Sequence, residues 1–581
     1  MKGGENKHRG HREHRGRTRN GSDLESKLPL TPCPLCCLYS LCSLCPLCFN
    51  FSAARRALAR FALVLAVVVV ACLKGAPVAV AASESASVEH LYSEWRFGEA
   101  DRALAALVKT HPDEPGTLLA KGYERFLAGD FRAAVAEYKA ALGANVAPAP
   151  LKEMLSLAEG SAKVVDGYLE RKSAHFLFRF PVEDSVLADY GLETLEAAEA
   201  ALAGDLGYEP SRPIPVDILR NSADLATMTT LPDDEIERTG TVAVSKWSRI
   251  MLTSPRAMRL GYEWQDSLSH EFIHYVVAAL THDRAPVWLQ EGFAKFLEHR
   301  WRMAAGLSLN PSMQHFLAKA LANGKLITFD AMHPSMAKLP RAEDATLAFA
   351  EVTTAVACLF AKGGSAALRE VLATVRDGGD ARVAVARAYG GSGTWAEFER
   401  AWRQFMTGLH YKTLPGLEPI VPKYKKKGVS SVLSEDDASS TAGEADRFLR
   451  LGNMMLLRNR ARAASVEYEK GYKIAGNSHW IFPVKLGRTY LALGEADRAL
   501  KVVGGAEATY PELPWPHLIA GQAALAKGDV QASVASLTLS LAINPYDPSV
   551  HCSLAEAYKR LPDASADRRQ RAERDCRELG K

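Results

Sequence analysis

The sequence predicts an α+β central domain between two all-α segments built from helical hairpins. Three observations support this fold class. Helical patterns near the C-terminus recur at intervals of 34 or 35 residues, and a weaker copy lies at 84–165. Between them, apolar residues at helical spacing predict two helices, over 264–280 and 286–298, preceded by a strand within 239–253.

Composition and charge restrict the function classes. Of the 581 residues, 48% are hydrophobic and 24% are charged, so most of the chain can bury cores. The formal net charge is +4. The first 82 residues carry +8, so residues 83–581 carry −4. The folded part therefore lacks the positive charge that nucleic-acid binding needs, and no nucleic-acid partner is expected.

Residues 1–54 form a basic, cysteine-rich leader. Seven of the ten cysteines lie in the first 72 residues, and only Cys358, Cys552 and Cys576 follow. Three cysteines in a long chain predict no disulfide framework. Two interpretations of the leader stay open: non-native sequence ahead of a mis-assigned start codon, which is favoured, and a metal site, which the cysteine spacings fit poorly.

Residues 55–82 are typical of a signal peptide. Arg55, Arg56 and Arg60 precede the apolar run 61–73, and an A-x-A site follows at 79–81. Cys72 also fits a bacterial lipobox, in which the cysteine is lipidated. Ordinary cleavage, lipidation at Cys72 and a retained anchor stay open, with a lipid anchor at Cys72 as the predicted membrane contact. We expect an exported protein: periplasmic, in the cell envelope or secreted.

The helical patterns on both flanks resemble the tetratricopeptide repeat. At the C-terminus, over 444–576, small residues recur at matching positions: Leu451-Gly452, Leu486-Gly487, Ala520-Gly521 and Leu554-Ala555, with Ala464, Ala499 and Ser533 twelve positions after the first three pairs. Three repeats and a final helix fit 445–575. The N-terminal segment 84–165 contains one full repeat around Gly122 and traces of an earlier one. Such arrays bind a protein partner or serve as a packing scaffold, and both uses stay open. Residues 412–443 are polar, rich in proline and serine, and predict a linker.

The chemistry is concentrated in the predicted helix 264–280, which contains His270-Glu271-Phe272-Ile273-His274. His270 and His274 lie one turn apart on one face, so both imidazoles can reach a single metal ion. Glu271 lies about 100° around the helix, where it can approach water at the metal without binding the metal.

A second helix completes the predicted site. Glu291 lies 17 residues beyond His274, within PVWLQEGFAKFLE at 286–298. Pro286 suits a helix start. Glu291 as third ligand would leave the fourth position open for water, as in a catalytic zinc site.

These motifs resemble the gluzincin metallopeptidases. HEFIH followed by WLQEGFA is similar to the aminopeptidase-like branch, and more closely to bacterial peptidase MA-like domains attached to tetratricopeptide repeats. The resemblance covers 170–411 and implies a thermolysin/aminopeptidase-like α+β core, with strands at 174–180 and 213–219 and closing helices at 388–406. It also implies Zn²⁺ as cofactor.

The resemblance assigns roles to four residues. It implies that His270, His274 and Glu291 are the zinc ligands and that Glu271 is the general base. One position departs from the family pattern: Phe349 replaces a family tyrosine and has no hydroxyl to donate to an oxyanion. Tyr389 and Tyr275 are the candidates to replace it. His282 and His299 are expected to lie at the surface or to support the ligands.

The leading hypothesis is an exported zinc metallopeptidase that hydrolyses peptide or protein substrates. A motif such as G-A-M-E-N, which aminopeptidases carry before the metal-binding helix, is absent from the sequence, which favours an endopeptidase. The alternative is a catalytically weak or inactive peptidase-like scaffold that binds protein partners through its repeats, and Phe349 favours it. A third class is zinc-dependent hydrolysis of a non-peptide bond.

The signal peptide gives the first prediction. A chain that begins near residue 50, expressed in a bacterium, should be exported and shortened, because the basic and apolar regions fit the secretion machinery. Mass spectrometry identifies the new N-terminus. Ala82 would indicate ordinary cleavage, and a diacylated Cys72 would indicate a lipoprotein. An intact leader in the cytoplasmic fraction would contradict both.

Overall fold

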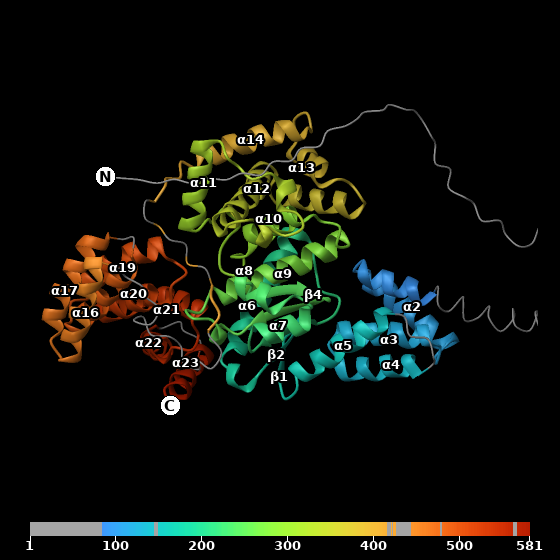
Figure 1. The fold of residues 1–581 in the computed structure, drawn as a ribbon, viewed down its shortest axis with the longest axis horizontal. Coiled ribbons are helices and arrows are strands. Elements are labelled where there is room, and N and C mark those ends of the chain that lie inside the picture. The colour runs from blue at the N-terminus through green and yellow to red at the C-terminus, as the bar shows by residue number, and fades with distance from the viewer. Residues whose placement is uncertain are drawn as a thin grey trace, which may run out of the picture. The chain divides into compact units, whose positions relative to one another are not determined.

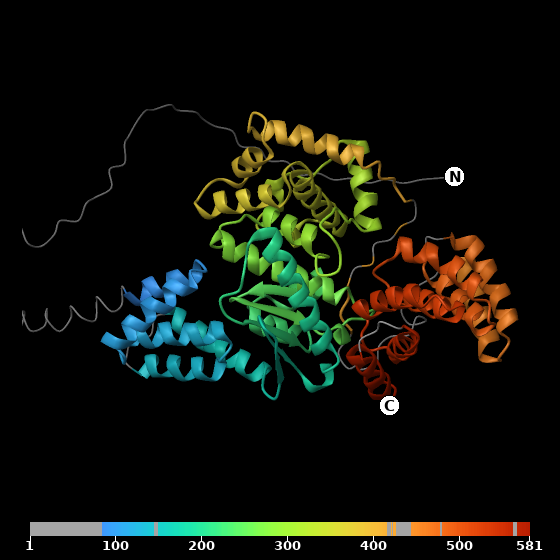
Figure 2. The same ribbon diagram turned by 180° about the vertical axis from the view of Figure 1, so that it is seen from behind.

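The computed structural model describes residues 84–143, 149–414, 443–476, 479–561 and 566–581, with a few positions between 417 and 425. All of them belong to one compact unit, Lys74–Lys581. The leader 1–54 and the predicted signal peptide 55–82 lie outside the described residues. Figures 1 and 2 show the order of the elements from two opposite sides.

The N-terminal segment is helical throughout its described part. Residues 84–93 form a helix, and four more follow: α2 Phe97–Thr110, α3 Pro115–Ala128, α4 Phe131–Gly143 and α5 Ala149–Val164. Gly122 of α3 permits close packing on α4, because a Cβ atom there would lie 2.5 Å from the Tyr138 ring. Gly129 ends α3 in the left-handed conformation, with φ of 84°.

A five-stranded mixed sheet forms the centre of the molecule. Its order is β1-β2-β3-β5-β4; the β2–β3 and β3–β5 pairs are parallel, and the outer pairs are antiparallel. The strands are β1 Leu169–Lys172, β2 Phe176–Phe180, β3 Ile214–Leu219, β4 Ala243–Lys246 and β5 Arg249–Thr253. β3 and β5 are buried along their whole length, as central strands covered on both faces should be.

Alternation along the strands assigns the two faces of this sheet. Phe178, Val216 and Ile250 share one apolar cluster with residues of α6 Leu187–Leu206 and α9 Trp264–Thr281. Leu219 and Met251 belong to a second cluster, which includes residues of α2, α3 and α4. Helix α9, which carries the His270 motif, therefore packs on one face of the sheet, and most of the N-terminal apolar residues pack on the other. The two groups of helices meet beside the sheet, where Trp95 packs against Tyr275 of α9.

A buried charge cluster links the second face to the N-terminal hairpins. Asp217 on β3 binds Arg179 of β2 through two hydrogen bonds of 2.6 and 2.9 Å, and Arg249 of β5 lies 3.4 Å away. Both arginines also donate to backbone carbonyls at the end of α3: Arg179 to Gly129 at 2.7 Å, and Arg249 to Leu127 at 3.3 Å. The negative end of the α3 dipole favours these cations.

The expected strand within 239–253 is wrong in one respect, because the structure divides it into β4 and β5. Trp247 and Ser248 form the turn, with left-handed φ values of 57° and 54°. This hairpin turn normally carries Asn-Gly or another glycine pair. Trp-Ser gives no such signal, so alternation alone suggested one strand. β4 is one of the two edge strands of the sheet.

Helices complete the central domain. They are α7 Ser222–Thr229, α8 Asp233–Thr239, α10 Val287–Leu297, α11 Pro311–Asn323, α12 Ala342–Arg376, α13 Ala381–Tyr389 and α14 Trp395–Gly408. Among the described helices, α12 alone has the length and hydropathy of a membrane span. Because 67% of its apolar window is buried, and residues along it belong to the central cluster, it is a core helix here.

The C-terminal segment contains eight described helices in four hairpins, so the expectation of three repeats and a final helix is wrong by one helix. They are α16 Gly443–Leu457, α17 Ala461–Ala475, α18 Ile481–Ala492, α19 Ala496–Thr509, α20 Pro514–Lys527, α21 Val530–Ile543, α22 Pro548–Arg560 and α23 Ala566–Leu579. Gly452 and Gly521 allow the helices to approach closely, since a Cβ there would lie 2.2 Å from Tyr468 and 2.5 Å from Leu537, respectively.

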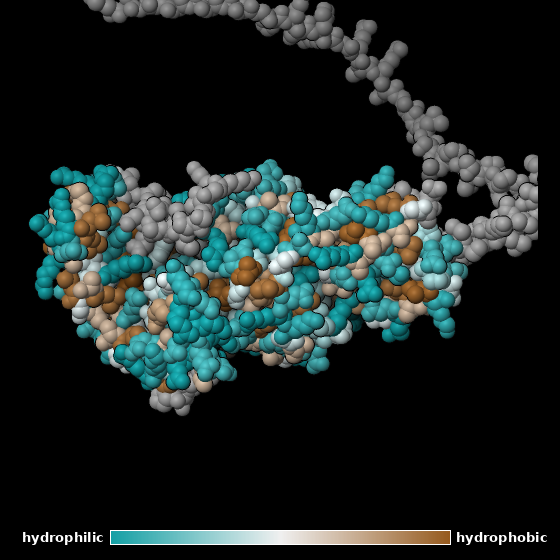
Figure 3. Space-filling view, turned by 90° about the horizontal axis from the view of Figure 1, so that it is seen from below, coloured by the Kyte–Doolittle hydropathy of each residue, from teal (hydrophilic) through white to brown (hydrophobic). Residues whose placement is uncertain are grey.

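Figure 3 shows hydrophobic residues only as scattered patches among hydrophilic ones on one face of the molecule.

A disulfide between Cys552 and Cys576 joins α22 to α23. Cysteine counting did not predict this bond, because the third cysteine, Cys358, made the number odd. Cys358 is free and buried in α12.

The C-terminal hairpins and the predicted linker both contact the central domain. Trp264 Nε1 donates to the Leu541 carbonyl at 3.1 Å, and the Tyr546 hydroxyl donates to Asp184 at 2.7 Å. Within the expected linker 412–443, Tyr424 pairs with Met258 in an isolated β-bridge, and its hydroxyl donates to the Thr241 carbonyl at 2.6 Å. At least this part of the linker is therefore attached to the domain.

The charge cluster gives the second prediction. Asp217→Ala should lower the free energy of unfolding by about 3–5 kcal/mol, because it leaves two buried arginines without their carboxylate. Urea denaturation measures the change. As control, Glu399→Ala removes an exposed pair, with Arg403 at 3.0 Å, and should change stability by less than about 0.5 kcal/mol. Equal effects of the two substitutions would contradict the assigned role of Asp217.

Candidate metal centre and active site

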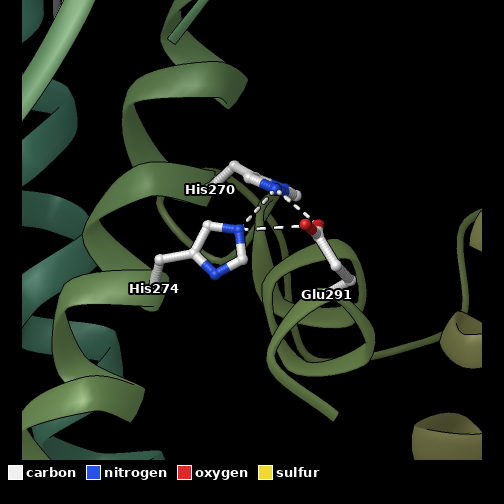
Figure 4. A group of neighbouring side chains, drawn as sticks. All are labelled: His270, His274 and Glu291. Atoms are coloured by element: carbon white, nitrogen blue, oxygen red, sulfur yellow. Dashed lines mark hydrogen bonds and ion pairs between the residues drawn. The ribbon is translucent and has the colours of Figure 1, made fainter. Parts of the chain in front are cut away.

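Helix α9 places two histidines side by side. It spans Trp264–Thr281, where the sequence predicts a helix, and ends at His282 in the left-handed conformation. His270 and His274 lie on one face of α9, and Glu291 reaches toward them from α10 (Figure 4). The two histidine Nε2 atoms are 3.1 Å apart. They lie 3.4 and 3.5 Å from Glu291 Oε2.

These three side chains fit a metal ion. Their ligand atoms all lie within 4.8 Å of one another. Tetrahedral Zn²⁺ with bonds of about 2.0–2.2 Å would place its ligand atoms about 3.3–3.6 Å apart, close to the distances observed. Two imidazoles and one carboxylate are also the donor set of a catalytic zinc site with one open position.

Close packing fixes the helix that carries Glu291. A Cβ atom on Gly292 would lie 2.9 Å from the Val352 carbonyl of α12, so glycine lets α10 approach α12 closely. Leu289 and Phe293 are fully buried on the apolar side of α10. Glu291 is thereby held at the edge of the core. Burial alone would raise the pKa of Glu291, but His274 and His270 outweigh it and hold the pKa well below its usual range.

Sequence reasoning missed Glu298, which supports His270. Glu298 Oε2 lies 3.1 Å from His270 Nδ1, and Lys295 Nζ donates to Glu298 Oε1 at 2.7 Å. Burial opposes ionisation, but Lys295 and His270 keep the pKa of Glu298 at about 2. An ionised carboxylate at Nδ1 orients the ring so that Nε2 faces the ion. The available signal was the spacing: Glu298 follows Glu291 by seven residues, two turns along one face.

The two carboxylates beside His270 raise its pKa. Burial lowers the pKa of His270, but hydrogen bonds to Glu291 and Glu298 outweigh it and raise the pKa to about 10. A metal ion at Nε2 would therefore compete with a proton for the same lone pair.

Glu271 lies beside the three-residue cluster and faces the same cavity. Its side chain is only 7% exposed. Burial raises the pKa of Glu271, while the neighbouring His274 and His270 lower it. A backbone hydrogen bond links it to Ser245 on β4. The edge strand and the predicted base are therefore in direct contact.

The cluster opens into a cavity of about 880 Å³. Lining residues come from α8, the β4–β5 hairpin, α9, α10, α11 and α12, and also from the N-terminal helices, which contribute Tyr92, Trp95 and Tyr123. The sequence did not predict that the N-terminal hairpins form a wall of this cavity, because the contact joins segments more than 100 residues apart.

The tyrosine candidates do not lie where the prediction required. Phe349 on α12 lines the cavity, but among its described lining residues neither Tyr275 nor Tyr389 is present. Tyr275 points into the core and packs against Trp95 and Tyr208. Among the remaining histidines, His299 lies 3.5 Å from Asp266 and 3.6 Å from Glu298, whereas His282 ends α9.

The contact between Glu298 and His270 gives the third prediction. Glu298→Gln should weaken metal affinity about 10- to 100-fold, because the amide carries no charge to hold the imidazole. Competition with a fluorescent zinc chelator measures the affinity. Glu370→Gln, at an exposed position of α12, is the control and should leave it unchanged. If Glu298→Gln bound the metal as tightly as the wild type, Glu298 would have no role in the metal site.

Comparison with known families agrees with this geometry over part of the chain. Residues 194–408 match the family model described as the peptidase MA superfamily. The match contains β3, β4, β5, the metal cluster and Phe349, and it ends with α14. No curated protein matches the chain. Residues 194–408 are thus similar to a peptidase MA superfamily domain, which supports a peptidase domain of the gluzincin type with a small mixed sheet and many helices.

Proposed function

We propose that this protein is a zinc-dependent metallopeptidase that hydrolyses internal peptide bonds. The observation that carries the proposal is the convergence of His270, His274 and Glu291 within 4.8 Å, with Glu271 facing the same cavity. Two adjacent helices supply all four residues, so folding of the domain core is enough to assemble the site.

Each residue has a defined task in the proposed mechanism. His270, His274 and Glu291 would hold the ion, and a bound zinc ion supplies Lewis-acid activation of water and of the peptide carbonyl. Glu271 accepts the proton of the attacking water on its carboxylate and then gives it to the leaving amine. Glu298 keeps the His270 ring in place through Nδ1.

The edge of the sheet provides a place for the substrate. β4 is an edge strand, and all of its residues line the cavity. A peptide in extended conformation can add to such an edge through backbone hydrogen bonds. Because Ser245 also contacts Glu271, a peptide on β4 would pass beside the predicted base.

Export is part of the proposal. The disulfide between Cys552 and Cys576 suits an oxidising compartment, and the signal sequence at 55–82 leads there. We therefore place the protein in the periplasm, in the cell envelope or outside the cell, with lipidation at Cys72 as one form. The helical hairpins of the C-terminal segment support tetratricopeptide repeats there, and in this proposal they bind substrate or partner proteins.

One observation favours a second candidate function. Phe349 lines the cavity where the family carries a tyrosine, and neither Tyr275 nor Tyr389 is among the described lining residues. A peptidase-like scaffold of low or no activity, which acts through its repeats, would need no hydroxyl there.

The fourth prediction separates these functions. Purified protein should hold about one zinc ion per chain, because three ligands close one site. Glu271→Gln should keep the zinc and the thermal stability, since Glu271 is not a ligand. It should lower peptide hydrolysis by about 100-fold or more, because the amide cannot accept the proton. Metal analysis and cleavage of a proteome-derived peptide library measure the two effects.

Two further variants complete this test. His274→Ala should lose the zinc, which checks that the assay reports the proposed site. Phe349→Tyr restores a hydroxyl in the cavity, and a higher kcat would show that its absence limits a working enzyme. If wild type and Glu271→Gln cleave the library equally, the scaffold function is correct.

A further inference from the structure

Four aromatic side chains gather on the wall of the cavity that the N-terminal hairpins form. Tyr92, Trp95 and Tyr123 come from these hairpins, and Trp247 comes from the turn between β4 and β5. We call these four residues the aromatic wall. Tyr92 and Tyr123 contact each other edge to face, with ring centroids 6.0 Å apart. The wall lines the same cavity as His270 and His274.

Both tryptophans of the wall have an unfavourable backbone conformation. Trp95 has φ of 60° and Trp247 has φ of 57°, in the left-handed region that bulky residues rarely adopt. Neighbouring rings hold them there: Trp95 packs on Tyr275 at 4.8 Å between centroids, and Trp247 on Phe126 at 6.0 Å. Strained residues of this kind concentrate at ligand sites. Two of them on one cavity wall therefore indicate a binding role.

Trp247 also leaves a hydrogen-bond donor without a partner. Its Nε1 atom is buried and has no acceptor among the described residues. An unpaired buried donor is costly, so an acceptor from a bound ligand would be favourable. Trp247 directly follows β4, where a peptide on the sheet edge would leave the strand. A backbone carbonyl of that peptide is the acceptor that the position suits.

The charges near the wall favour a basic ligand. Glu235 and Asp283 line the cavity, and among the described residues neither carboxylate forms an ion pair. The two lysines of the cavity are already engaged: Lys295 with Glu298 at 2.7 Å, and Lys246 with the Thr229 carbonyl at 2.8 Å. Aromatic faces attract cations as well, and Lys246 Nζ already lies 4.7 Å from the centroid of the Trp247 ring. The carboxylates and the other rings therefore favour the same kind of side chain.

We propose that the aromatic wall binds an extended polypeptide segment that carries lysine or arginine, outside the bond that is cleaved. The inference rests on the proposed peptidase function and adds a substrate class to it. Trp247 Nε1 donates to a backbone carbonyl of the segment, and Glu235 pairs with a basic group. The half-buried rings of the wall contact the side-chain stems, whereas Tyr92, which is only 2% exposed, packs against Tyr123. The N-terminal hairpins thereby become part of the substrate site.

Equilibrium binding tests this proposal without hydrolysis. The probe is a fluorescent peptide with lysine at every second position, which an extended chain presents on one side, and its counterpart with norleucine. Both are titrated into zinc-loaded Glu271→Gln full-length protein, with anisotropy as readout. The lysine peptide should bind tighter, and added salt should weaken its binding alone, because ionic strength screens the carboxylates.

Two substitutions in the same background separate the contributions. Trp247→Phe keeps a ring but removes the donor, and should weaken binding of both peptides by about three- to tenfold, the weight of one hydrogen bond. Glu235→Gln should reduce the preference for lysine by about two- to fivefold. Trp395→Phe and Glu153→Gln change the same residue types outside the cavity and should leave binding unchanged.

The outcomes are distinguishable from failure of the proposed function. In one outcome, wild-type protein cleaves no peptide while the lysine peptide still binds and the two substitutions weaken its binding as expected. That result would support the aromatic wall as a binding site and contradict the peptidase function. Equal binding of both peptides, or unchanged binding in both Trp247→Phe and Glu235→Gln, would contradict the proposed binding role of the aromatic wall. Thermal melting of each variant shows whether it is folded, and Glu235→Gln provides the test if Trp247→Phe is not.

Discussion

The buried pairing of Asp217 with Arg179 and Arg249 is the constraint on which the rest of the molecule depends. Burying three charges is costly unless each finds partners, and here the arginines find theirs both on the sheet and at the end of α3. If the sheet and the N-terminal hairpins separated, Arg179 and Arg249 would therefore lose their hydrogen bonds to the end of α3. Because of this contact, helices that precede the central domain in sequence form a fixed wall of its cavity.

Helix α9, which carries His270 and His274, is held along its length by different parts of the chain. The Leu541 carbonyl accepts a hydrogen bond from Trp264 at its start, β4 contacts Glu271 in its middle, and Glu298 holds the His270 ring. Metal centres require ligand positions accurate to a fraction of an ångström. Contacts from three parts of the chain hold α9 and the His270 ring in place, as such a centre would require.

Local patterns predicted what depends on local spacing. The periodicity of α9 and α10 identified both helices, and the spacing of His270, His274 and Glu291 identified a cluster that the fold brings together. The sequence did not predict the break between β4 and β5. Trp247 and Ser248 adopt left-handed conformations there, and neither is the glycine that would normally indicate such a turn. The pairing of Cys552 with Cys576 and the approach of Tyr123 to the cavity depend on tertiary packing, which periodicity does not encode. Glu298 was visible in the spacing but needed the position of His270 to give it a role.

The contact between Tyr546 and Asp184 bears on what counts as one domain in this protein. Asp184 is 1% exposed and accepts from the Tyr546 hydroxyl at 2.7 Å, across 362 positions of sequence. It lies before the segment that matches the peptidase MA superfamily, and Tyr546 lies far beyond it. A fragment cut to that segment would lose both residues, together with the Leu541 acceptor of Trp264. The segment that resembles the family is therefore shorter than the unit that these contacts hold together.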